Sequence, residues 1–165
     1  MDDVGWGPLP GIDGASVRRA GAADLPALVA LLADDPLGAA REAPGEDLAP
    51  YARAFAAVDA DPAHLLVVVA DGEDVVGTLQ LSFLPGLSRR GALRAQVEGV
   101  RVRADRRGDG VGEALLRWAV AAAARRGCAL VQLTSDSTRA DAHRFYERMG
   151  FVASHTGFKL TLDGS

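Results

Sequence analysis

The spacing of apolar residues predicts four helices. In each stretch the apolar side chains recur at every third or fourth position, so that they share one face of a helix. Glycine ends two of these helices, at Gly127 and Gly150, and Thr138 with Asp141 fits a capping box at the start of the last one. The predicted helices cover residues 24–32, 48–60, 111–126 and 138–149.

Shorter apolar runs predict a sheet. Two of them flank the turn Asp71–Asp74, as in an antiparallel hairpin. Strands 97–103 and 128–134 enclose the third helix in a β-α-β unit, which makes them parallel, and the second is apolar enough to be buried on both faces. Gly99 indicates a bulge or a close backbone approach. The predicted strands are 17–20, 64–70, 75–81, 97–103, 128–134 and two closing strands, 151–152 and 156–162.

Length and composition point to one compact domain. The chain has 165 residues, of which 48% are hydrophobic and 24% charged, and no repeat or linker divides it. Residues 1–14 are rich in glycine and proline, so we expect a flexible N-terminal arm before a single domain at 15–163. The order of elements predicts an α/β protein of the α+β type, with a mixed sheet.

The same counts exclude several classes of protein. With one cysteine, Cys128, the chain forms no internal disulfide, and it has too few Cys and His residues for a zinc module, so we expect no metal. An acidic start and the lack of a long apolar run argue against a signal peptide or membrane contact and for a cytoplasmic protein. The net charge of −4 argues against nucleic-acid binding, although arginines cluster between residues 89 and 107.

The segment Arg107–Gly112 carries the clearest chemical signal. It lies where a strand gives way to a helix, and three of its residues are glycine. Glycine permits positive φ angles and leaves backbone N–H groups uncovered at the positive end of the helix, which makes a cradle for an anion. Arg107 adds a bidentate donor for phosphate oxygens. The alternative is an ordinary turn that starts a helix, with exposed arginines.

The spacing distinguishes this segment from other phosphate-binding motifs. A P-loop requires Gly-Lys-Ser/Thr, which is absent, and a dinucleotide fingerprint needs its third glycine one residue beyond Gly112. The pattern is Arg-x-x-Gly-x-Gly, formed by Arg107, Gly108, Asp109, Gly110, Val111 and Gly112. It resembles the coenzyme A pyrophosphate-binding motif of the GNAT superfamily of N-acetyltransferases. Ala142–Phe151 resembles the late helix and following strand of that superfamily, and residues 133–158 are further similar to aminoalkylphosphonate N-acetyltransferases.

The resemblance implies a fold and a cosubstrate. The expected GNAT fold has a mixed, mostly antiparallel sheet of six to seven strands and about four helices. Its two parallel strands splay apart and leave a gap for the pantetheine arm of acetyl-CoA, which pairs with the backbone near Val100 and Val102. Ser135 and His143 join these valines and the six motif residues as expected cofactor-binding residues. Turn formation explains Ser135 equally well, and capping of a polar helix face explains His143.

The resemblance also suggests catalytic residues. Acyl transfer needs a neutral amine, stabilisation of the oxyanion and a proton for the departing thiolate. Tyr146 is the candidate acid, because a phenol with a pKa near 10 stays protonated at neutral pH. Glu98 is the candidate base, acting through water, and the Val100 N–H is the candidate oxyanion donor. The alternatives are a tyrosine at the edge of the core and an ordinary exposed strand carboxylate.

We therefore expect an acetyl-CoA-dependent N-acetyltransferase that moves the acetyl group directly to a primary amine of a small molecule in a ternary complex. The alternative is a non-catalytic acyl-CoA-binding or regulatory module on the same fold. Substrate contacts are expected from residues 34–60 and 84–93. The charge of the acceptor stays open, because Glu42 suits a cationic amine and Arg53 an anionic one. A homodimer through the closing strands is a candidate assembly.

Overall fold

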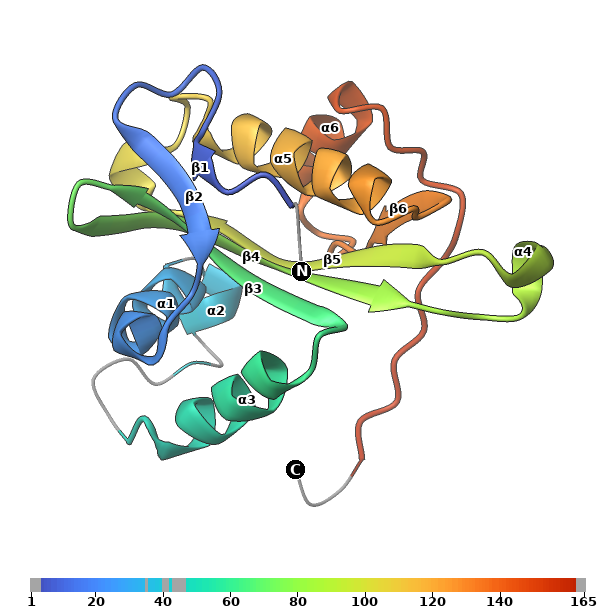
Figure 1. The fold of residues 1–165 in the computed structure, drawn as a ribbon, viewed down its shortest axis with the longest axis horizontal. Coiled ribbons are helices and arrows are strands. Elements are labelled where there is room, and N and C mark those ends of the chain that lie inside the picture. The colour runs from blue at the N-terminus through green and yellow to red at the C-terminus, as the bar shows by residue number, and fades with distance from the viewer. Residues whose placement is uncertain (1–3, 35, 40–41, 43–46, 163–165) are drawn as a thin grey trace.

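The described chain folds into a six-stranded sheet with helices on both faces (Figure 1). This computed structural model describes residues 4–34, 36–39, 42 and 47–162. Neighbouring strands are antiparallel except for the last pair, which confirms the predicted mixed sheet. In order across the sheet, the strands are β1 (Gly7–Pro8), β2 (Ala15–Arg19), β3 (His64–Asp71), β4 (Asp74–Leu84), β5 (Arg94–Val102) and β6 (Leu130–Leu133).

The helices form two layers. In Figure 1, α1, α2 and α3 lie on one face of the sheet, and α5 and α6 lie on the other, while α4 is a short turn at the far end of the β4–β5 hairpin. The four longer helices confirm the four predicted ones. The apolar faces of α1 and α5 are buried, whereas α3 and α6 have no fully buried residue. The helices are α1 (Leu25–Ala33), α2 (Pro36–Ala39), α3 (Ala49–Ala60), α4 (Ser88–Gly91), α5 (Val111–Arg125) and α6 (Ala140–Arg148), with 3-10 turns at Ala22–Asp24 and Ala104–Arg106.

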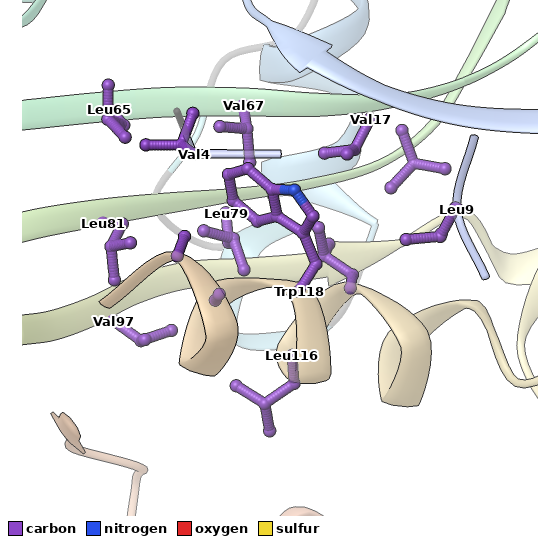
Figure 2. Close-up of a cluster of buried hydrophobic side chains, with 14 of the residues drawn as sticks. Val4, Leu9, Val17, Leu65, Val67, Leu79, Leu81, Val97, Leu116 and Trp118 are labelled. Carbon is purple, nitrogen blue, oxygen red and sulfur yellow. The ribbon is translucent and has the colours of Figure 1, made fainter. Parts of the chain in front are cut away.

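The main core lies between α5 and the sheet. Leu115 and Leu116 of α5 are fully buried, and Trp118 reaches the strands beside Val67 and Leu79 (Figure 2). Burial of each such side chain stabilises the fold by about 1.5–3 kcal/mol. This packing fixes the N-terminus of α5 relative to the end of β5.

The segment before residue 15, predicted as a flexible arm, packs against the domain. Val4 and Leu9 are each only 2% exposed, and β1 pairs with β2. The indole Nε1 of Trp118 donates a hydrogen bond to the Gly5 carbonyl at 2.8 Å, and its ring lies 5.4 Å from that of Trp6. Glycine and proline prevent a regular helix or a long strand here, but they leave these side chains able to enter the core. The domain boundary at residue 15 stays a prediction.

The predicted β-α-β unit is confirmed. β5 and β6 are parallel and are joined by α5, with pairing from Arg94–Leu130 to Val97–Leu133. The predicted irregularity at Gly99 is a β-bulge: the pairing of β4 with β5 shifts at this point, and Gly99 has a φ of 61°. The bulge turns the second half of β5 relative to the first.

Two predictions about the end of the chain are wrong. All four residues of β6 are only half-buried, and residues 151–162 form no closing strands. Cys128, expected within the buried strand, precedes β6 and is half-buried. In the described part of the chain no strand lies beyond β6, so its outer edge is uncovered, and its residues stay half-buried although Val131 and Leu133 pack against the core. An apolar pattern indicates a preference for burial but does not choose the partner.

Candidate active site

The glycine-rich turn opens α5 as the motif predicts. Gly110 is the N-cap residue of α5, with a left-handed φ of 85°, and Gly108 has a φ of 92°. A Cβ atom on Gly108 would meet nothing within 4 Å, so this side of the turn is open. The Ala114 N–H bonds to the Gly110 carbonyl at 2.9 Å, so the amides of residues 110–113 precede the bonded part of the helix. The turn can therefore offer backbone donors to an anion.

Two arginines brace this turn. Arg106 forms ion pairs with Asp109, at 3.2 Å, and with Asp71. Arg107 donates from Nε to the Val102 carbonyl at 3.0 Å and from Nη2 to a carboxylate oxygen of Asp34 at 2.8 Å. The Arg107 guanidinium thus already has a carboxylate partner, and its predicted contact with phosphate stays a prediction. What the arginines do in this structure is fix the loop that carries the glycines.

The parallel strands separate next to the turn. Pairing between β5 and β6 stops at Val97 and Leu133, and in the described part of the chain no strand pairs with the second half of β5 on that side. The Val100 carbonyl accepts a hydrogen bond from Nη1 of the Arg101 side chain at 2.9 Å. The backbone N–H of Arg103 donates to the Val76 carbonyl of β4 at 2.9 Å. Because main-chain groups alternate between the two edges of a strand, those of Val100 and Val102 face the open edge. This is the position that the resemblance predicts for the pantetheine arm.

Tyr146 of α6 lies in an aromatic cluster beside this gap. Its ring makes edge-to-face contacts with Phe145 at 5.2 Å and Phe151 at 6.0 Å. Burial raises the pKa of the phenol, and the nearby charges of Arg139 and Arg101 oppose that rise. The phenol is therefore protonated at neutral pH, as a proton donor must be.

Ser135 and His143 lie near the end of β6. The Ser135 hydroxyl oxygen is buried and has no hydrogen-bond partner in the described structure, so a ligand that reaches it would satisfy an orphaned polar group. His143 lies 2.8 Å from the Asp136 carbonyl, to which its Nε2–H donates. This contact ties α6 to the preceding loop, and binding of the cofactor by His143 stays a prediction.

The capping box predicted at Thr138 and Asp141 does not form. The N-cap residue of α6 is Arg139 and makes no side-chain cap, because the Thr138 hydroxyl donates instead to the Asp136 carboxylate at 2.6 Å. The Thr138 N–H adds a second bond at 2.9 Å, and the two together lower the pKa of the Asp136 carboxyl. Asp136 therefore orders the loop before α6.

Glu98 lies at the edge of a cavity on the opposite face of the sheet. The cavity has a volume of about 230 Å³. Residues 34–60 were expected to contact substrate and do contribute four side chains from α3, whereas residues 84–93 contribute none of the described lining, because they lie at the far end of the β4–β5 hairpin. The described lining residues are Leu25, Leu28, Val29, Leu32, Tyr51, Ala54, Phe55, Val58, Leu66, Thr78, Gln80, Glu98 and Gly99.

A buried carboxylate fixes the helix that forms one wall of this cavity. Asp24, just before α1, accepts hydrogen bonds from two guanidinium nitrogens of Arg18, at 2.7 and 2.8 Å, and from the Gly21 N–H at 2.7 Å. The bonds from Arg18 hold the pKa of the Asp24 carboxyl below its usual value. Its contribution to stability is thus present above about pH 4 and is lost as the pH falls through the lowered pKa.

Two further findings bear on the kind of site. Within the described ranges, no three His, Cys, Asp or Glu side chains form a group that could hold a metal ion. None of the helices in the described part of the chain is long and apolar enough to cross a membrane.

Several known proteins are similar to this chain in sequence and in fold. The model of the acetyltransferase (GNAT) family matches residues 25–151. An aminoalkylphosphonate N-acetyltransferase of Salmonella typhimurium is 35% identical over 109 residues, which cover 66% of this chain and 70% of that protein. A transcriptional regulator from Bacillus halodurans has a crystal structure with a TM-score of 0.86 and 44% identity, over 90% of this chain and 99% of that one. A putative acetyltransferase from Agrobacterium tumefaciens has a TM-score of 0.76 and is 32% identical, over 89% of this chain and 99% of that one.

Proposed function

This chain belongs to the acetyltransferase (GNAT) family, and from that premise we propose that it transfers an acetyl group from acetyl-CoA directly to a primary amine of a small molecule. The supporting observation is the open edge of β5 beyond Val97, which links the glycine turn of α5 to the cavity at Glu98. A cosubstrate held at the turn and along this edge would meet an amine held in the cavity. The reaction would take place in a ternary complex, in the cytoplasm and without a metal.

The site residues divide the chemistry between them. The motif residues Arg107–Gly112 would hold the diphosphate, and Val100, Val102, Ser135 and His143 would contact the rest of the cosubstrate. The buried, unbonded hydroxyl of Ser135 and the open space at Gly108 fit such a ligand. Acetyl-CoA supplies the activated acetyl group.

Proton transfer completes the reaction. The amine nitrogen forms a bond to the thioester carbonyl carbon as the bond from carbon to sulfur breaks. Glu98 takes the proton that the amine loses, through a water molecule, the Val100 N–H donates to the carbonyl oxygen, and Tyr146 donates its proton to the thiolate. This last transfer suits a thiolate with a pKa of about 8.5, because the phenol is present in its acid form.

One comparison favours a second candidate function. The relative from Bacillus halodurans is called a transcriptional regulator, which agrees with a non-catalytic acyl-CoA-binding or regulatory module. Release of free thiol from acetyl-CoA, measured over a panel of amines, tests the two against each other. Amine-dependent release supports the transferase, whereas tight acetyl-CoA binding with no release on any amine supports the regulatory module.

Tyr146→Phe is expected to lower turnover by about 10- to 50-fold, because the thiolate loses its proton donor. The dissociation constant of acetyl-CoA should change little, since the ring and its contacts remain. Thiol release gives kcat, and titration calorimetry gives the affinity. A variant as active as the parent would remove Tyr146 from the acid role.

A further inference from the structure

The lining of the cavity at Glu98 carries information about the acceptor. Nine of its described residues are aliphatic or aromatic and come from α1, α3 and β3; they are Leu25, Leu28, Val29, Leu32, Tyr51, Ala54, Phe55, Val58 and Leu66. No arginine or lysine is among the described lining residues, and Glu98 is the one with a formal charge. The Thr78 hydroxyl donates its proton to the Val67 carbonyl at 2.7 Å, so it cannot donate a hydrogen bond to a ligand in the cavity.

We propose that the acceptor is an amine with an apolar alkyl or aryl body and no anionic group. This inference rests on the proposed function, since it names the class of substrate for that site. An apolar body would bury itself against α1 and α3, and its ammonium group would be drawn to Glu98 before deprotonation. A phosphonate or carboxylate in the same cavity would lose its hydration without gaining a cation, which weakens its binding.

The size of the cavity sets a limit on that body. A volume of about 230 Å³ corresponds to roughly eight water-sized groups at ~30 Å³ each. An arylalkylamine such as 2-phenylethylamine is of this size, whereas an oligosaccharide or a peptide would have to leave most of its atoms outside.

A comparison of two amines tests the inference. We expect kcat/KM for 2-phenylethylamine to exceed that for 2-aminoethylphosphonate by about 100-fold. Ala54→Arg places a cation at an exposed helix position on the cavity wall and should reduce this preference by about ten-fold or more. Ala56→Arg, also exposed on α3 but outside the cavity lining, is the matched control and should leave the ratio unchanged.

The outcomes separate this inference from the proposed function. A preference for the phosphonate in the parent protein would overturn the acceptor class and leave the acetyltransferase intact. If no amine of the panel causes thiol release, both the acceptor class and the proposed acetyltransferase activity are overturned.

Discussion

Gly110→Glu is expected to weaken acetyl-CoA binding by at least about 100-fold while leaving the protein folded. Two effects combine at this residue. A side chain on Gly110 meets Ile12 at 3.5 Å and is strained by the left-handed φ of 85°. The larger effect is electrostatic, because the carboxylate would stand at the N-terminus of α5, where the proposed diphosphate carries the same charge.

The strain and the charge can be separated with a matched variant. Gly127, just past the other end of α5, also has a left-handed φ, of 77°, and a Cβ there would meet nothing within 4 Å. Gly127→Glu therefore imposes a similar backbone cost but places the charge far from the proposed diphosphate. Titration calorimetry with acetyl-CoA should show parental affinity for Gly127→Glu and little or no heat for Gly110→Glu. Equal affinities for the two folded variants would mean that the turn does not hold the diphosphate.

Local signals were sufficient for the part of the fold that surrounds this turn. The period of the apolar residues changes from strand to helix at Val111, and three glycines mark the change. These features act over a few residues, so the sequence predicts α5, its position between two parallel strands, and the bulge at Gly99. The motif at Arg107–Gly112 could be recognised for the same reason.

Features that depend on distant contacts were not predictable in this way. Val4 and Leu9 enter the core because Trp118 and Arg125, more than a hundred residues away, bond to the carbonyls of Gly5 and Val4. A Gly- and Pro-rich composition contains no sign of these bonds.

The sequence indicated Glu98 and the segment 34–60 but not the rest of the cavity, for a related reason. Its walls come from α1, α3, β3, β4 and β5, and no single stretch of sequence carries its outline. The one usable signal was the repeat of leucines at positions 25, 28 and 32, which gives α1 an apolar stripe but does not say whether a neighbouring helix or a ligand covers it.

Glu98→Gln is expected to lower kcat/KM by about 100-fold near neutral pH and to remove one acidic limb of the pH–rate profile. Only a deprotonated carboxylate can take up the proton of the amine, so the activity that depends on this base falls in acid. Glutamine keeps the size and the position of the side chain at the cavity edge but cannot take up a proton. Glu73→Gln, an exposed carboxylate in the β3–β4 turn, is the matched control and should retain the parental profile.

The acceptor also gives an acidic limb, because only the neutral amine attacks the thioester. Two acceptors that differ in pKa distinguish the two origins: a limb from the amine moves with the acceptor, whereas a limb from the enzyme stays at the same pH. In the parent we expect one limb of each kind, and in Glu98→Gln only the limb that moves. If the stationary limb persists in Glu98→Gln, the proton is taken by another group, and the cavity at Glu98 would bind the acceptor without activating it.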